Sequence, residues 1–413
     1  MSALSGSALV IGGGVVGLAC ALSLQRKGWH VTLVDAGAKA LAPSWGNAGH
    51  IAVEQVEPLA SPAMLRSVVR RHYAFGGAVD VRRPFRHAGW IARYLRACTP
   101  SRHRAGQAAL RDLLAQSLPA WHRLVHAIGA PELLQARGHW VCWESPVSAR
   151  RGRRGWGQAD TGTTVVSDLP ASELAALQTR LSVPIADGIA FRGTAQVVDL
   201  LCLAAKLSDA FLRAGGVRRR AHLQLRSRPG NRVHAMTEQG DWLVADRVLV
   251  CAGAGSRALL APLGLQVPLI AERGYHLHWQ HHGWPDLPPV VFEDRSMIVT
   301  RFADGLRAAG FVEYADAGDP ADSRKWHRLC EHVWQLGLPV DGEPARWFGA
   351  RPTLPDYLPA LGRCESFDNL FYAFGHQHLG LTLAALTGEL MGSLCSGERG
   401  TVDLAPFDLT RFG

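Results

Sequence analysis

The chain is poor in lysine. Only four of its 44 basic residues are lysines, Lys27, Lys39, Lys206 and Lys325, and the arginines are scattered along the sequence. A nucleic-acid-binding surface is typically built from basic residues gathered in one patch or stripe, so we expect no nucleic-acid partner. The net charge of +9 fits an anionic substrate or contact with an anionic membrane surface equally well.

The sequence also lacks the signatures of metal sites, disulfides and membrane spans. None of its eight cysteines lies in a Cys-x-x-Cys pair or at a Cys/His spacing typical of zinc, so neither a metal centre nor a disulfide framework is predicted. No uncharged apolar run reaches the roughly 18 residues of a membrane helix, and the start of the chain has no cationic segment typical of a signal peptide. We therefore expect a cytoplasmic protein, or one that is peripheral at the inner membrane.

What the chain does have is a dinucleotide-binding pattern in residues 8–35. A short apolar run predicts a buried strand, and Gly12, Gly14 and Gly17 follow it at Gly-x-Gly-x-x-Gly spacing. An apolar helix and a second strand ending at Asp35 come next. The glycines permit a tight turn, close approach to a pyrophosphate and close packing of the helix on the strand, while the acid can accept hydrogen bonds from ribose hydroxyls. The sequence therefore predicts a nucleotide-binding domain at the N-terminus.

Two later segments predict further contact with the same ligand. A strand expected to end at Cys251 leaves through Ala252 and Gly253, and it would lie beside the first strand. Near the C-terminus, Gly375 and Gly380 punctuate a passage from a strand to a helix expected at 382–396, whose N-terminus favours negative charge. Two such anion sites suggest a long ligand with two anionic ends, such as a flavin nucleotide. A plain helix bounded by glycines is the alternative.

The middle of the chain predicts a second domain inserted into the first. Apolar residues recur at helical spacing through much of 58–128. Short strands at 290–292, 297–302 and 306–311, joined by Asp/Gly turns, predict an antiparallel sheet. Residues 148–163, rich in arginine and glycine, are expected to form a loop.

Five passages together resemble the FAD-dependent D-amino-acid dehydrogenase and glycine oxidase group of flavin oxidoreductases, the DAO type. They are the N-terminal fingerprint and the stretches SWGNAG, VLVCAGAGS, WFGARPTLPDYLPALG and GHQHLGLTLA. The resemblance implies an α/β fold in which a Rossmann-like FAD-binding domain is interleaved with an α+β substrate domain carrying an antiparallel sheet. We expect the FAD-binding parts at 1–57, 188–264 and 345–413, and the substrate domain at 58–187 and 265–344.

The cofactor implied by this resemblance is FAD. Some relatives attach it through a histidine in the loop after the second strand, where this chain has Asn47, so we expect dissociable, non-covalent FAD. No second nucleotide site is evident, which argues against NAD as a co-substrate. The cofactor-binding residues expected are Gly12, Gly14, Val15, Val16, Gly17, Asp35, Ala36, Ser44, Asn47, Ala48, Gly49, Cys251, Ala252, Gly253, Gly375, His376, Leu379, Gly380, Leu381 and Thr382.

The activity implied is oxidative deamination, in which a hydride passes from the substrate Cα to flavin N5 and the imine hydrolyses to a keto acid. Arg351 matches the family's carboxylate-binding arginine, and a bidentate guanidinium suits that role; an ordinary buried ion pair is the alternative. His378 is expected over the active site, Tyr275 at the pocket edge and His50 at the end of the flavin-side loop. A purely structural role is the alternative for each of these three.

Several functional alternatives remain open at this point. D-Amino acids, including imino acids such as D-proline or D-hydroxyproline, are the first expectation for the substrate. A glycine/sarcosine-type amine oxidase is the second, and a flavin-binding electron-transfer subunit without its own substrate is the third, which a carboxylate-binding Arg351 would argue against. The electron acceptor, whether O2, a quinone or a partner protein, is not indicated by any residue pattern.

Overall fold

The computed structural model describes residues 6–37 and 42–413 of the chain. A six-stranded sheet forms one half of the molecule. The first five strands in its order are parallel to one another and the last is antiparallel to its neighbour. The central β1 is apolar and buried because helices cover the sheet, as is typical of parallel sheets. The order is β10 (Val217–Arg220), β2 (His30–Asp35), β1 (Ser7–Ile11), β14 (Arg247–Val250), β23 (Leu370–Phe374) and β22 (Ala360–Arg363).

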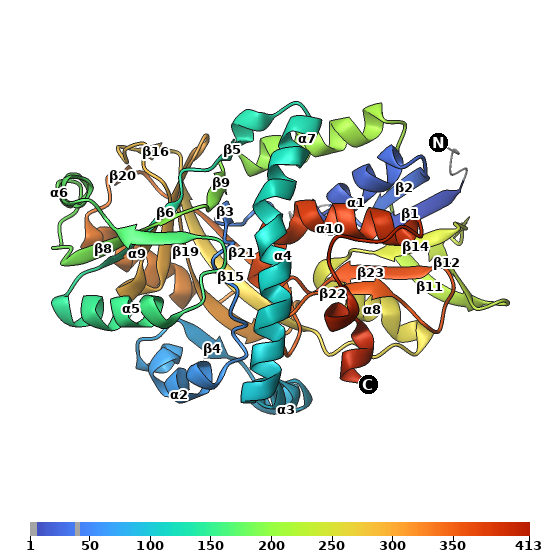
Figure 1. Ribbon diagram of the computed structural model, residues 1–413, viewed down its shortest axis with the longest axis horizontal. Helices are drawn as coiled ribbons and strands as arrows, with labels where there is room; N and C mark the ends of the chain where they lie inside the picture. The colour runs from blue at the N-terminus through green and yellow to red at the C-terminus, as the bar shows by residue number, and fades with distance from the viewer. Residues whose placement is uncertain (1–5, 38–41) are drawn as a thin grey trace.

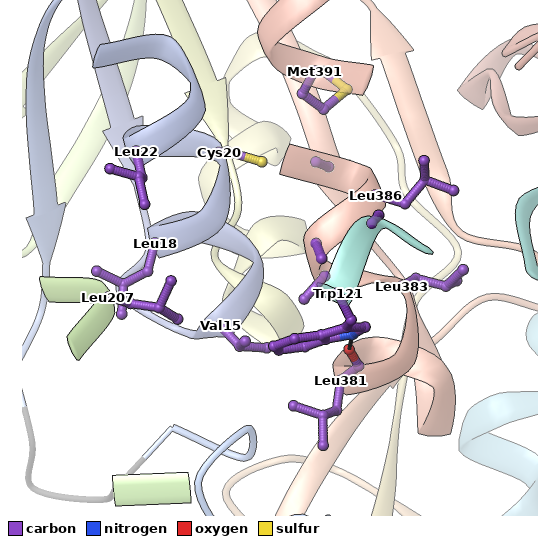
Figure 2. Packing of buried hydrophobic residues seen from close by; sticks show 14 of the residues in the cluster. Val15, Leu18, Cys20, Leu22, Trp121, Leu207, Leu381, Leu383, Leu386 and Met391 are labelled. Atoms are coloured by element: carbon purple, nitrogen blue, oxygen red, sulfur yellow. Dashed lines mark hydrogen bonds between the residues drawn. The ribbon is translucent and has the colours of Figure 1, made fainter. Parts of the chain in front are cut away.

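Helices from both ends of the sequence pack together over this sheet. α1 (Val15–Arg26) lies against α10 (Gly380–Cys395) and α7 (Leu200–Arg213), and α4 (Pro100–Ala127) packs on α10. The approach of α1 and α10 is close, because a β-carbon at Gly388 would lie 2.8 Å from the carbonyl oxygen of Ala19. Figure 2 shows Trp121 of α4 in this cluster, where its indole N–H donates to the carbonyl of Leu381 at 3.1 Å.

A larger sheet forms the other half, and α4 crosses between the two halves in the view of Figure 1. In the described part of the chain it contains nine strands. Most neighbours are antiparallel, as the sequence predicts; β17 with β6 and β4 with β19 are parallel. The order is β21 (Ala345–Thr353), β15 (Ile270–Trp279), β19 (Gly305–Ala315), β18 (Met297–Phe302), β17 (Val290–Phe292), β6 (His139–Trp143), β8 (Asp187–Arg192) and β7 (Val165–Asp168), with β4 (Val79–Val81) beside β19.

Smaller sheets and helices accompany the two halves. Two three-stranded sheets and one two-stranded sheet occur in the residues described. None of the helices in those residues is long and apolar enough to cross a membrane. The remaining elements are α2 (Pro62–Arg71), α3 (Ala88–Ala97), α5 (Pro146–Gln158), α6 (Ala171–Gln178), α8 (Ser256–Leu260), α9 (Ser323–Leu336), β3 (His50–Ile51), β5 (Leu134–Gln135), β9 (Ala195–Val197), β11 (Leu223–Arg228), β12 (Arg232–Thr237), β13 (Trp242–Leu243), β16 (His281–His282) and β20 (Val340–Asp341).

The prediction of a loop at 148–163 is wrong, because most of this segment forms the helix α5. A capping box starts this helix: the Ser145 hydroxyl accepts a hydrogen bond from the Ser148 N–H at 3.1 Å, which satisfies a donor that the first turn leaves free. Gly152 lies against the ring of Trp143 so closely that a β-carbon would collide with it. The glycine that lowers helix propensity is therefore needed for packing.

The division into interleaved segments remains a proposal. β8 and β21 pair within the nine-stranded sheet, although the expected boundaries at 188 and 345 assign most of β8 and all of β21 to the FAD-binding side. We propose that the chain returns to the six-stranded half twice. The first return follows β8, and the second follows β21. Arg351 then belongs to the substrate domain's sheet and faces a cavity that both halves share.

Candidate active site

A cavity of about 1830 Å³ collects residues from both halves of the molecule. It is lined by the ends of β1, β2 and β14, by much of the segment 42–55, by β15 and β21, and by residues 376–378, 380 and 381. The carboxyl ends of parallel strands are where α/β folds bind nucleotides. This volume therefore joins a nucleotide-type site to the face of an antiparallel sheet.

The nucleotide end is built by the first glycine turn. Gly12 has a φ of +116°, and a β-carbon there would collide with the carbonyl of Cys251. Gly17 is equally restricted, because its β-carbon would collide with the carbonyl of Gly12. The turn therefore passes directly against β14, and α1 begins immediately behind it. Only glycine fits at these two positions, because any other residue would place a β-carbon on a neighbouring carbonyl group.

Asp35 closes the other side of this turn. Its Oδ2 accepts a hydrogen bond from the Gly13 N–H at 2.7 Å, and its Oδ1 accepts one from the Gly37 N–H at 2.8 Å. The Ser44 hydroxyl accepts a hydrogen bond from the Val15 N–H at 3.1 Å, in the first turn of α1. Asp35 and Ser44 thus border the place that the fingerprint reserves for a ribose and a pyrophosphate.

The other candidate anion site lies at the start of α10. The helix begins at Gly380 after a short 3₁₀ turn at Gln377–Leu379, two residues earlier than expected. Its N-cap residue, Leu379, makes no side-chain capping hydrogen bond, and Gly380 and Leu381 line the cavity. Two helix N-termini therefore border the cavity, and the first follows a turn in which Gly12 and Gly17 leave no room for a β-carbon. Two such N-termini fit an extended dinucleotide such as FAD.

The expected cofactor residues fall into two groups. Five do not line the cavity: Gly17 and Gly49 allow close packing, Gly375 has a φ of +78°, Leu379 is buried, and the Thr382 hydroxyl accepts a hydrogen bond from the Ala52 N–H at 2.9 Å. The residues that line it are Gly12, Gly14, Val15, Val16, Asp35, Ala36, Ser44, Asn47, Ala48, Cys251, Ala252, Gly253, His376, Gly380 and Leu381.

Arg351 lies on β21, opposite Glu272 of β15. Its Nη1 donates to Glu272 Oε1 at 3.4 Å, and the arginine side chain remains 29 % exposed. The guanidinium lies over Gly274, where a β-carbon would collide with Nη2. Among the described residues its only hydrogen-bond acceptor is Glu272, so the ion pair leaves donors available for a ligand carboxylate. A planar guanidinium binds a carboxylate best through two such donors.

Glu272 is a residue that the sequence analysis did not identify. It is 1 % exposed and accepts hydrogen bonds from the Thr353 hydroxyl at 3.0 Å and the Tyr357 hydroxyl at 3.1 Å. The Tyr357 hydroxyl is also hydrogen-bonded to that of Tyr314. Burial raises the pKa of both tyrosines well above its ordinary value, so they remain neutral phenols. The available signal was the position of Glu272 directly before Arg-Gly-Tyr-His in the predicted strand.

The three other candidate catalytic residues are placed differently. His378 borders the cavity; removal from water lowers its pKa to about 4, and the ring is therefore neutral at pH 7. The ring of Tyr275 also borders the cavity, but its hydroxyl donates to Glu313 at 2.6 Å within a buried network. His50 lies at the start of β3, and its Nε2 is 3.1 Å from Glu54 Oε1. His378 and His50 thus present ring nitrogens near the cavity, whereas the Tyr275 hydroxyl is already bonded elsewhere.

This fold and site define a flavin-dependent oxidoreductase. The DAO family, described as FAD dependent oxidoreductase, matches residues 7–394, and the chain belongs to it. The chain is 32 % identical over 418 residues to a D-amino-acid oxidase of Bradyrhizobium diazoefficiens, covering 98 % of both chains. It is 28 % identical over 432 residues to a D-amino acid dehydrogenase of Paramagnetospirillum magneticum, again covering 98 % of both.

The solved structures agree on the fold. Glycine oxidase from Geobacillus kaustophilus superimposes with a TM-score of 0.70 at 22 % identity, over 98 % of each chain. The expected fold class and the FAD cofactor are therefore confirmed. The roles assigned to individual site residues remain predictions.

Proposed function

We propose that this protein oxidises the Cα–N bond of D-amino acids, including imino acids of the D-proline kind. The observation that supports this most directly is Arg351, a partly exposed guanidinium with unused donors in the same cavity as the dinucleotide turn. A free carboxylate on the substrate is what such a group recognises. The two curated relatives named above, an oxidase and a dehydrogenase of D-amino acids, agree with this substrate class.

The protein's own contribution is mainly to position the substrate. FAD, when bound, supplies the acceptor for the hydride that leaves Cα. Arg351 binds the carboxylate, while Glu272, held by Thr353 and Tyr357, orients the guanidinium. Alignment of the reacting bond lowers the barrier by removing orientational freedom. The resulting imine hydrolyses to the keto acid.

The attachment of FAD is proposed to be non-covalent. Asn47 stands in the loop where some relatives have a linking histidine, and its side-chain oxygen accepts a hydrogen bond from the Gly49 N–H at 2.8 Å. A carboxamide cannot form the flavin linkage. The electron acceptor stays open among O2, a quinone and a partner protein. We also propose peripheral contact with a membrane.

A glycine- or sarcosine-type amine oxidase is the second candidate. The similarity to a glycine oxidase structure favours it at the level of the fold. Arg351 is compatible with both candidates because glycine and sarcosine also carry carboxylates. An electron-transfer subunit without a substrate has no use for a guanidinium held in this way, so it is the weakest alternative.

One experiment separates these candidates. The purified holoenzyme is mixed anaerobically with D-amino acids including D-proline, with their L-enantiomers, and with glycine and sarcosine, and bleaching of the visible flavin band is recorded. We expect bleaching by D-amino acids. Arg351→Lys should raise KM about 10- to 100-fold, the loss of one charge-assisted hydrogen bond. A response to L-amino acids alone, or to glycine and sarcosine alone, would overturn the proposal.

A further inference from the structure

Three buried polar atoms without a hydrogen-bond partner gather at the wall of the active-site cavity. They are His50 Nδ1, Glu54 Oε2 and His378 Nδ1, and all three residues line this cavity. The side chains of His50 and Glu54 are only 9 % and 2 % exposed. Buried polar atoms normally have partners, so unpartnered atoms on three residues that line one cavity mark this wall as a candidate ligand contact.

Two bonds join the strands that carry His50 and Arg351 to the segment that contains His378. The Ala52 N–H at the end of β3 donates to the Thr382 hydroxyl in the first turn of α10. Thr353 at the end of β21 forms an isolated bridge with His376. The segment 376–382 is therefore bonded to both strands. Arg351, His378 and His50 all line the same cavity, so a ligand whose carboxylate is bound by Arg351 shares that cavity with His50.

Glu54 determines which nitrogen of His50 is free. Burial alone would raise the pKa of Glu54, but the neighbouring His50, which also hydrogen-bonds to it, holds this pKa below its ordinary value. The carboxylate is therefore ionised at neutral pH and can only accept, so Nε2 of His50 carries the proton. In the neutral form of the ring, Nδ1 then keeps its lone pair. A carboxylate behind an imidazole orients the ring and stabilises its protonated form, as in catalytic triads.

The other groups facing His50 do not oppose a positive charge on it. The ring of His139, on β6, meets that of His50 edge-on with centroids 4.5 Å apart, and its Nδ1 is 3.0 Å from the Thr194 hydroxyl. Burial lowers the pKa of His139 to about 3, so this ring is neutral. His378 is neutral for the same reason. The anion Glu54 is thus the only charged side chain in this group.

We propose that His50 accepts the proton of the substrate's α-ammonium group, with Glu54 as its positioning residue; this rests on the proposed function. The N–H bond breaks, its electron pair stays on nitrogen, and the proton bonds to His50 Nδ1. The freed pair then forms the C=N bond of the imine as the hydride leaves Cα with the electrons of the C–H bond. Only a neutral amine can provide that pair, which gives the proton acceptor its function.

The test compares variants across pH in anaerobic rapid mixing, using the D-amino acid that bleaches the flavin fastest in the panel above. In His50→Gln the rate of flavin reduction at pH 7 should fall about 100-fold, the usual scale of general-base catalysis. It should approach the wild-type rate above the pKa of the substrate's own amine. Glu54→Gln should show a smaller loss with the same recovery. His332→Gln, a histidine that does not line the cavity, is the matched control and should behave as wild type.

A binding measurement separates this role from a structural one. Propionate has a carboxylate but no amine, and its dissociation constant, read from the flavin spectrum, should be the same in wild type and His50→Gln. An equal loss of rate at every pH, weakened propionate binding, or loss of FAD from both variants would overturn the proposal.

Two further outcomes are distinguished. His50, Glu54 and His139 also have a geometry that could hold a metal ion. Metal analysis that finds one equivalent in wild type and none in His139→Ala would overturn the proton-accepting role. A wild-type enzyme reduced by sarcosine alone would overturn the D-amino-acid assignment, while the same pH comparison with sarcosine would still decide the role of His50.

Discussion

The guanidinium of Arg351 occupies the space that a side chain at residue 274 would need. A β-carbon on Gly274 would collide with Nη2 of Arg351, and both residues lie on paired strands of the nine-stranded sheet, two positions apart in register. The absence of a side chain at 274 therefore allows the arginine to lie flat over the sheet. The carboxylate-binding geometry depends on this glycine as much as on the arginine.

Gly274→Ala should consequently weaken substrate binding. We expect KM to rise about 10- to 100-fold, because the displaced guanidinium loses the charge-assisted hydrogen bonds it makes to the substrate carboxylate. Flavin content should be unchanged. Steady-state kinetics with the best D-amino acid measures the effect. Gly157→Ala is the control, since nothing lies within 4 Å of its β-carbon; a similar KM in both variants would contradict the prediction.

Gly12→Ala should abolish FAD binding. The added carbon would collide with the Cys251 carbonyl, and the φ of +116° is unfavourable for alanine. The ratio of flavin to protein absorbance after gel filtration measures retention. Gly255→Ala is matched to it: this glycine also lines the cavity, but its φ is −71° and the nearest atom to its β-carbon is 3.8 Å away. Full flavin content in Gly12→Ala would show that the turn is not the binding site.

Acid precipitation should release all of the flavin into the supernatant. Asn47 provides no nucleophile for a covalent bond to the isoalloxazine ring, and its carboxamide already bonds to the Gly49 N–H. The measurement is the visible spectrum of supernatant and redissolved pellet. A yellow pellet that persists after proteolysis and washing would show a covalent linkage at another residue.

Stability should fall as pH drops below about 6.5. Burial lowers the pKa of His139 to about 3, of His276 to about 2 and of His376 to about 3. Between these values and the ordinary pKa near 6.5, the unfolded chain binds protons that the folded chain does not, so each such histidine lowers the unfolding free energy by about 1.4 kcal/mol per pH unit. The loss begins below pH 6.5 and continues to the folded-state pKa.

Urea unfolding of the holoenzyme at pH 5.0 and 6.5 tests this, with His376→Gln as the comparison. His376 bonds to Thr387 within α10, so its removal costs stability at both pH values. The difference between the two pH values should nevertheless shrink in the variant, because one proton-binding difference is gone. An undiminished difference would mean that His376 is charged in the folded state.

The sequence alone determined those parts of the protein that depend on neighbours along the chain. The turn from Gly12 to Gly17 and the acid at Asp35 lie within one strand–helix–strand unit, where spacing and steric demands of glycine are sufficient to predict the geometry. The same holds for the glycines before α10. The five passages that resemble the DAO family were recognisable in the same way, and the family and its FAD followed from them.

Tertiary structure decided what lies between distant segments. Glu272 meets Arg351 because β15 and β21 pair in one register, and no periodicity in either strand indicates that register. His139, 89 residues from His50 in sequence, meets it only because β6 and β3 converge on the cavity. The hydroxyl of Tyr275 is bonded to Glu313 rather than available for substrate, and α5 forms because Gly152 fits against Trp143. Such contacts depend on packing between elements, which a local pattern of residues does not encode.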